Sequence, residues 1–223
     1  MSGLVPSARA VRVMEPVNRC VVIGSTQSDV VLDRSRLAAA GIQAARRRSG
    51  GSAVMVGPCD LVWVDVVVPA VDPLWLADVG RAGWWLGDQW ANALAASGCP
   101  GAQVWRGSLV RTAWSDRVCF AGLGPGEVTV RGRKVLGVSQ RRTRAGALFQ
   151  CALLVEWAPA ELLDVLHLDE EDRAQGGRDL AGVAAGVGAE GAAAALEAFI
   201  AGLGRQDRDR AGSSRVRDLP STR

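Results

Sequence analysis

One long helical pattern, set between groups of short β-branched runs, most constrains the fold of this chain. Within residues 73–97, apolar side chains recur three and four positions apart: Trp75, Val79, Ala82, Leu86, Trp90 and Leu94. This spacing predicts an amphipathic helix that begins near Pro73 and ends before Gly98. Because short apolar runs precede and follow it, we expect the helix to cover a sheet.

The shorter runs have the length and composition of strands separated by glycine-containing turns. We expect strands at 18–24, 61–68, 103–111, 116–120, 127–131, 134–139 and 150–156, and further helices at 33–40, 159–167 and 190–203. This order predicts an α+β fold with a mostly antiparallel central sheet flanked by helices. We interpret the acidic run at 169–172 as a solvated loop.

The length of 223 residues suits one full hydrophobic core with a tail. We expect residues 1–203 to form a single domain. Residues 204–223 are charged, polar and without aromatic side chains, which predicts a disordered tail.

Composition narrows the classes of partner. A net charge of +3 gives no general affinity for nucleic acid. No apolar run is long enough to span a membrane, and no secretory leader is recognisable. The five cysteines are scattered and only one histidine is present, so a zinc site of these ligands is disfavoured. We therefore expect a cytoplasmic protein with reduced thiols that binds neither nucleic acid nor membrane.

Lys134 is the only lysine among 26 basic residues. A lysine ammonium is a compact charge with rotatable donors, whereas arginine is a planar fork. A site that directs one ammonium at a carbonyl or phosphoryl oxygen would not readily accept arginine. This contrast makes Lys134 the leading candidate for a catalytic residue.

Two segments combine positive charge with glycine. The first is Arg46-Arg47-Arg48-Ser49-Gly50-Gly51, and the second runs from Gly122 to Arg144 and contains Lys134. Glycines let backbone N–H groups approach an anion, and arginine binds phosphate or carboxylate with parallel hydrogen bonds. We expect the two segments to form an anion-binding pocket at the edge of a sheet.

Together these segments resemble the lipoate–protein ligase family of the biotin/lipoate ligase superfamily. The family motif Arg-Arg-x-Ser-Gly-Gly-Gly-Ala-Val matches residues 46–54, with Ser52 in place of the third glycine. An acidic residue follows at Glu127, and the later Gly-x-Lys strand matches residues 132–140. The similarity extends over roughly residues 10–203.

The resemblance implies a catalytic domain related to that of class II aminoacyl-tRNA synthetases. It implies an ATP- and Mg²⁺-dependent ligase that activates lipoate or octanoate as an acyl-adenylate. The acyl group would pass to a lysine on lipoyl carrier domains of 2-oxoacid dehydrogenases or on the glycine-cleavage carrier protein.

The resemblance also implies roles for individual residues. Lys134 would contact the acyl carbonyl and the phosphate. Substrate and nucleotide would be bound by Arg47, Ser49, Gly50, Gly51, Glu127, Gly137, Ser139 and Arg141. Within this set Arg47 would hold the phosphates, Ser49 and the two following glycines would line the acyl channel, and Glu127 would lie near the adenylate and its Mg²⁺.

Two alternatives stay open from the residues alone. The related octanoyltransferases take the acyl group from a carrier-protein thioester with a cysteine nucleophile. Cys151 is the nearest candidate for that role, and Cys59 and Cys119 are others. A non-catalytic protein that binds lipoate or nucleotide is the second alternative. It is suggested by Val56 and Gln150, which stand where the family usually has histidine.

Overall fold

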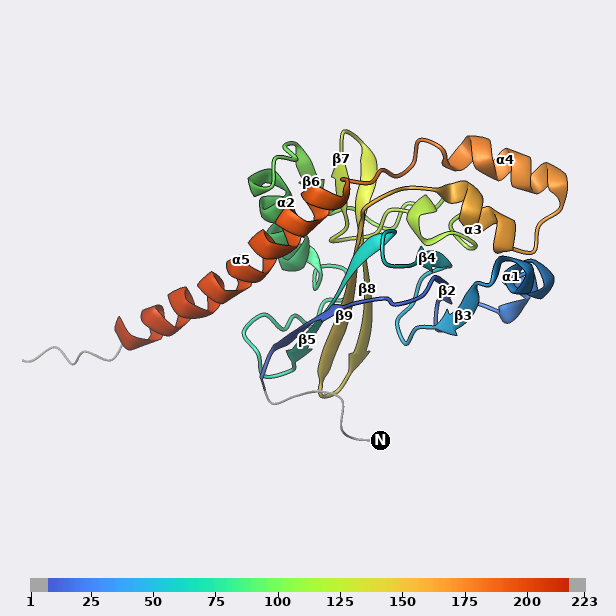
Figure 1. Cartoon of the computed structure of the whole chain (residues 1–223). Helices are drawn as coiled ribbons and strands as arrows, with labels where there is room; N and C mark the ends of the chain where they lie inside the picture. Colours follow the sequence, from blue (N-terminus) through green and yellow to red (C-terminus); the bar gives the residue numbers. More distant parts are fainter. Residues whose placement is uncertain (1–7, 217–223) are drawn as a thin grey trace, which may run out of the picture.

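Two β-sheets form the framework of this computed structural model, which describes residues 8–216 (Figure 1). The larger sheet consists of β1 (Ala10–Met14), β5 (Leu61–Pro69), β9 (Gly146–Leu154), β8 (Arg133–Thr143), β7 (Val128–Val130) and β6 (Ala102–Val104), in that spatial order. All its neighbouring strands are antiparallel. The smaller sheet contains β3 (Gln43–Arg46), β2 (Cys20–Ile23) and β4 (Val54–Val56), with β2 and β3 parallel.

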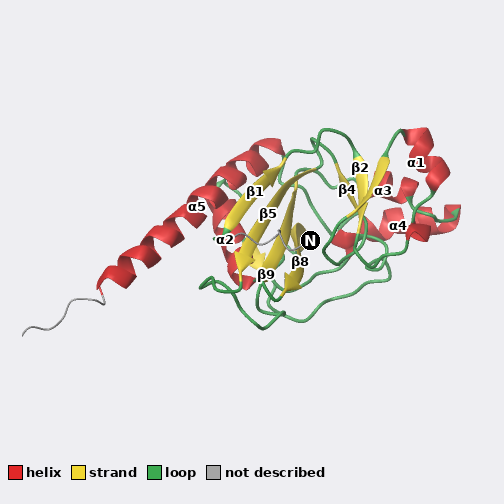
Figure 2. Cartoon of the chain, turned by 90° about the horizontal axis from the view of Figure 1, so that it is seen from below, coloured by secondary structure: helices red, strands yellow, loops and turns green. Residues whose placement is uncertain are grey.

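Within residues 8–216, five α-helices flank these sheets in two groups. They are α1 (Arg34–Ala40), α2 (Trp84–Ala96), α3 (Pro159–Val165), α4 (Glu170–Leu180) and α5 (Ala189–Val216). Helices α2 and α5 pack together beside the larger sheet, while α1, α3 and α4 gather around the smaller one (Figure 2). The predicted α+β fold with a mostly antiparallel sheet is confirmed. No helix in the described part of the chain is long and apolar enough to cross a membrane.

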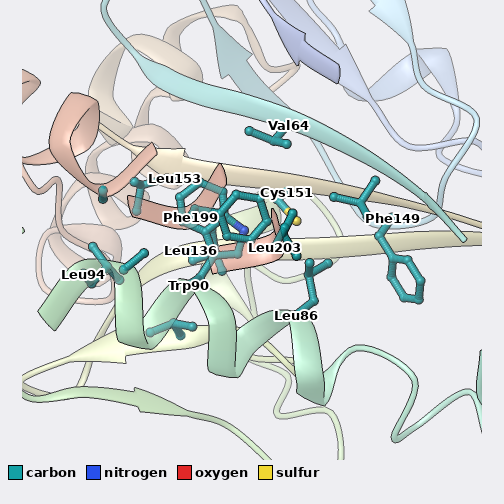
Figure 3. Close-up of a cluster of buried hydrophobic side chains, with 14 of the residues drawn as sticks. Val64, Leu86, Trp90, Leu94, Leu136, Phe149, Cys151, Leu153, Phe199 and Leu203 are labelled. Atoms are coloured by element: carbon teal, nitrogen blue, oxygen red, sulfur yellow. The ribbon is translucent and has the colours of Figure 1, made fainter. Parts of the chain in front are cut away.

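The main hydrophobic core lies between the larger sheet and helices α2 and α5. Trp90 of α2 stacks on Phe199 of α5, with ring centroids 4.0 Å apart. Figure 3 shows these rings beside Cys151 and Leu136, which come from the sheet. Alternate side chains of β8 and β9 therefore face this core, and their neighbours face the opposite side of the sheet.

Helix α2 is shorter than its apolar spacing predicts. It begins at Trp84, eleven residues after the expected start at Pro73. The Asp72 carboxylate accepts the Leu74 N–H, and Asp78 accepts the Gly80 N–H. Such short-range side-chain acceptors stabilise turns at the expense of helix. The apolar pattern over 73–83 therefore belongs to turns that precede the helix.

Three further segments differ from the sequence prediction. Of the predicted strand 103–111, only the part within β6 (Ala102–Val104) is a strand. The predicted strand 116–120 is instead a loop that ends in the short 3-10 turn Cys119–Ala121. The acidic run at 169–172 starts α4, because the Asp169 side chain caps the helix by accepting the Asp172 N–H at 2.7 Å. A cluster of acidic residues in the first turn complements the helix dipole. This run is therefore a helix start and not a loop.

The C-terminal helix is longer than expected. The pattern predicts a helix at 190–203, whereas α5 continues to Val216. Residues 204–216, which the sequence assigns to a disordered tail, thus belong to this helix. They contain no proline, and arginine and glutamine are good helix formers. The rest of the predicted tail, residues 217–223, lies outside the described residues.

Candidate active site

A cavity of about 550 Å³ lies on the face of the larger sheet opposite α2 and α5. Its walls come from the loop between β3 and β4, the loop before β7, and strands β5, β8 and β9. Seven of the residues predicted for the site line it: Arg47, Gly50, Gly51, Glu127, Lys134, Gly137 and Ser139. The fold thus brings the two glycine-containing segments together.

Lys134 is almost completely buried, with 3 % of its surface exposed. Its ammonium lies 2.7 Å from Oε2 of Glu127. It also donates to the backbone carbonyls of Cys119, at 3.2 Å, and Gly122, at 2.9 Å. The Phe120 ring lies under it, 4.9 Å from Nζ to the centroid. Since an ammonium has three N–H donors, all of them have protein acceptors here.

A β-bulge directs Lys134 into the cavity. The pairing of β7 with β8 shifts register between Val128 and Thr129, so Val135 is an extra residue on β8. Val135 and Leu136 both belong to the core beneath the sheet. Lys134 therefore shares the cavity face with Gly137, three residues away, which strict alternation would prevent.

Glu127 is held by the backbone as well as by the lysine. Its Oε2 accepts the Gly124 N–H at 2.6 Å, and its Oε1 accepts the Val138 N–H at 3.2 Å. With the Lys134 ammonium, three donors occupy the carboxylate. The described residues contain no cluster of three or more metal-ligating side chains. Because an ionised carboxylate has about four acceptor sites, three donors leave it some capacity, and Mg²⁺ near Glu127 stays a prediction.

Arg47 fixes the turn that carries the first glycine motif. Its guanidinium donates to the carbonyl of Gly50 at 2.9 and 3.1 Å and to the carbonyl of Val22 at 3.2 Å. Nη2 also lies 3.8 Å from Sγ of Cys119. Because Lys134 donates to the carbonyl of the same cysteine, the two cations converge on Cys119, which itself lines the cavity.

A hydrogen-bonded group of polar side chains lies further along the same face of the sheet. Ser49 is 1 % exposed and bonds to Oγ of Ser139 at 2.8 Å and to Oε1 of Gln150 at 2.6 Å. The amide of Gln150 donates to Oδ1 of Asp65 at 3.1 Å. The Trp63 indole donates to the same oxygen at 2.8 Å. Ser49 itself does not line the cavity, but it is hydrogen-bonded to two residues that do.

Like Ser49, the predicted residues Cys151, Arg141 and Cys59 are not among those that line the cavity. Cys151 faces the α2–α5 core with none of its surface exposed, and this burial raises the pKa of its thiol to about 12. A protonated, enclosed thiol is not a nucleophile, so Cys151 is wrong as a candidate. Arg141 is exposed near the end of β8, beyond the cavity wall. Cys59 is also exposed and belongs to a separate hollow of about 310 Å³.

Several wall residues have no role in the sequence prediction, among them Trp63, Phe120 and Asp116. Trp63 and Asp65 are alternate residues of β5, where a carboxylate interrupts an apolar strand. This pattern was the available indication that one face of the strand is not core. Phe120 lies in a turn that has no periodic pattern.

Known proteins resemble this chain in sequence or in fold. The family model described as the lipoyl protein ligase A/B catalytic domain matches residues 6–188. A comparison with curated protein sequences finds no match. Similar solved structures exist, and at 15–21 % identity they establish a common fold.

Three of these structures illustrate the fold. The bipartite lipoate protein ligase of Thermoplasma acidophilum, studied with its E2 lipoyl domain, superposes with a TM-score of 0.63 at 21 % identity over 87 % of this chain and 71 % of its own. LipL1 of P. falciparum in complex with lipoate gives 0.59 at 15 % identity, over 96 % of this chain. The present chain spans 51 % of that protein. A lipoate-protein ligase A bound with ATP gives 0.50 at 17 % identity, over 86 % of this chain and 81 % of its own.

Proposed function

The chain belongs to the lipoyl protein ligase A/B catalytic-domain family, and from this premise we propose that it is an ATP-dependent lipoate–protein ligase. It would join lipoate, or a related medium-chain acyl group, to a carrier-domain lysine through an acyl-adenylate. The observation that carries this proposal is the buried ammonium of Lys134 on the cavity wall, paired with Glu127. Arg47 lies close by, on the other side of Cys119.

The first step is attack of the acyl carboxylate on the α-phosphorus of ATP, with pyrophosphate as the leaving group. Negative charge develops on the phosphoryl oxygens during this displacement. Positively charged donors that are fixed before the reaction stabilise that charge most effectively. Lys134 and Arg47 are held by backbone carbonyls and fulfil this condition.

Substrate binding requires one exchange of partners at Lys134. Its three donors face Glu127 and the carbonyls of Cys119 and Gly122. An acyl or phosphoryl oxygen in the cavity would replace one of the two neutral carbonyls, because a charged acceptor forms the stronger hydrogen bond. Glu127 would stay paired and keep the ammonium in position.

The second step transfers the acyl group. The neutral amine of a carrier lysine attacks the acyl carbonyl, a C–N bond forms, the C–O bond to AMP breaks, and the amine loses a proton. The tetrahedral intermediate carries an oxyanion next to the Lys134 ammonium. Holding the acyl carbonyl at a fixed position also lowers the entropic cost of attack.

The structural relatives support the choice of substrates. The Thermoplasma ligase was studied with an E2 lipoyl domain, LipL1 with lipoate, and a lipoate-protein ligase A with ATP. By extension we propose lipoate and ATP as substrates. The proposed acceptors are lipoyl domains of 2-oxoacid dehydrogenases or the glycine-cleavage carrier protein. Mg²⁺ would enter as the counterion of ATP.

Cys119 favours a second candidate function, octanoyl transfer from a carrier-protein thioester. Its sulfur lines the cavity 3.8 Å from Nη2 of Arg47, so a sulfur nucleophile would lie beside a fixed positive charge in the proposed substrate site. In this reaction Cys119 would form an acyl thioester, release the donor thiol, and pass the acyl group to the carrier lysine. Cys119 replaces Cys151 as the nucleophile of this alternative.

One experiment separates the two reactions. Purified protein is incubated with apo lipoyl domain and either lipoate with Mg-ATP or octanoyl-carrier protein without ATP, and the intact mass of the domain is measured. We expect acylation with lipoate and ATP, and we expect it to persist in Cys119→Ala. Acylation only from the thioester, abolished in Cys119→Ala, would establish octanoyl transfer. Acylation from neither donor by folded protein would favour a non-catalytic binding role.

A further inference from the structure

The floor of the cavity consists of two consecutive cross-strand rows that differ in polarity. The first row aligns Gly137 of β8, Ala152 of β9 and Trp63 of β5. The second row, two residues further along each strand, aligns Ser139, Gln150 and Asp65. The first row offers small and apolar surface, whereas every side chain of the second row is polar.

The position of Lys134 indicates how an acyl chain would lie across these two rows. Its Cε lies 3.6 Å from the point where a Cβ on Gly137 would stand, so its side chain reaches the first row. Cζ of Phe120 lies 3.3 Å from the same point, so the Phe120 ring also reaches the first row. Ser139 is two strand residues further on, about 7 Å. An acyl chain with its carbonyl at Lys134 would cross the first row and end at the second.

The second row keeps hydrogen-bonding capacity that the protein does not use. Ser49 donates its single hydroxyl proton to Oε1 of Gln150, so the bond between Ser49 and Ser139 uses the Ser139 proton. One amide proton of Gln150 goes to Asp65. The second amide proton of Gln150 and a lone pair of Ser139 have no protein partner among the described residues, and both residues line the cavity.

We propose that this row selects an acid whose distal end carries a hydrogen-bonding group, such as a hydroxyl, over one that ends in a methyl group. This inference rests on the proposed function, because it places the acyl carbonyl at Lys134. A terminal hydroxyl can accept from the Gln150 amide and donate to Ser139. A terminal methyl group would displace water from these atoms without replacing its hydrogen bonds, which weakens binding.

The test compares octanoate with 8-hydroxyoctanoate by isothermal titration calorimetry, without nucleotide. We expect the hydroxy acid to bind about five- to tenfold more tightly, the equivalent of one or two buried hydrogen bonds. In Gln150→Met, which nearly keeps the side-chain volume, this preference should disappear. Ser139→Ala is a smaller change that should reduce the preference. It provides the test if the Gln150→Met variant fails to fold. Ser35→Ala, on exposed α1, is the matched control and should keep it.

Each outcome shows whether the preference for a polar distal group or the ligase proposal is overturned. Equal binding of both acids, or tighter binding of octanoate, overturns the inference but leaves the ligase proposal intact. A preference that persists in both variants shows that another part of the protein creates it, which also overturns the inference. If wild-type protein binds neither acid but binds lipoate, the inference is overturned and the ligase proposal stands. If it binds none of the three, the acyl channel itself is wrong and the proposed function falls with it.

Discussion

The Lys134 ammonium and the Glu127 carboxylate form a buried ion pair, with Nζ and Oε2 separated by 2.7 Å. Both side chains are less than a tenth exposed, and each is also hydrogen-bonded to backbone. Charges of this kind are stable in a protein interior only when they are paired and saturated with hydrogen bonds. The pair therefore holds the ammonium in a fixed position on the cavity wall.

Replacing Lys134 with arginine should reduce acyl transfer by about 100-fold or more, the typical effect of losing one preorganised donor. The charge remains, but the wider guanidinium cannot occupy the space between the Cys119 and Gly122 carbonyls and Glu127. The rate is followed by intact mass of the lipoyl domain. Arg133→Lys, at the exposed neighbouring position, is the control and should change the rate by less than about twofold. Comparable rates in the two variants would contradict a role for the ammonium.

Glu127→Gln should lower the free energy of unfolding by about 3–5 kcal/mol, because it leaves the Lys134 charge buried without its partner. The neutral amide keeps one oxygen and presents an N–H group to the donor of either Gly124 or Val138. Urea unfolding followed by tryptophan fluorescence measures the change. Asp88→Asn removes the exposed pair between Asp88 and Arg106 and should cost less than about 1 kcal/mol. Similar losses of unfolding free energy in both variants would show that the buried pair contributes no more to stability than the exposed one.

Gly51→Ala and Gly50→Ala form a matched pair in the first glycine motif. Gly51 has a φ of +99°, and a Cβ there would lie 2.5 Å from Nη2 of Arg47. We expect this variant to lose about 1–3 kcal/mol of stability through backbone strain and to displace the guanidinium. Gly50 has no atom within 4 Å of an added Cβ, so its variant should keep its stability. Thermal unfolding of both variants is the measurement, and equal melting temperatures would refute this account of Gly51.

The burial of Cys151 predicts a loss of stability at high pH. Its pKa rises from an ordinary 9.0 to about 12 in the folded protein. Between these values the unfolded chain has released the proton while the folded protein keeps it, so increasing pH favours unfolding. At pH 10.5 the cost is roughly 2 kcal/mol relative to pH 8.

This pH dependence is measured by urea unfolding at several pH values. Cys151→Ala should flatten the decline above pH 9, whatever its stability at neutral pH. Cys59→Ala, at an exposed thiol, should leave the decline unchanged. An identical decline in both variants would assign it to other groups.

The composition of the site follows from the sequence, but the choice among its cysteines does not. The single lysine and the Arg47–Gly51 motif indicate their chemistry because residue type and spacing are local properties. Cys119 and Cys151 look alike in sequence, since each lies in an apolar stretch. The Cys119 thiol lines the cavity, whereas the Cys151 thiol faces α2 and α5. This difference depends on which face of the larger sheet β9 presents at Cys151 and on where the turn Cys119–Ala121 packs.

The sequence by itself determined the α+β class, the strands β5 and β8, and the charged residues available to bind an anion. Periodicity and residue chemistry carry this information over a few neighbouring positions. Only the tertiary structure decided that a bulge at Val135 turns Lys134 into the cavity, that Glu127 neutralises it, and that Gln150 meets Ser49 and Ser139. These relationships depend on strand register and on contacts between residues up to 101 positions apart, which no local pattern encodes.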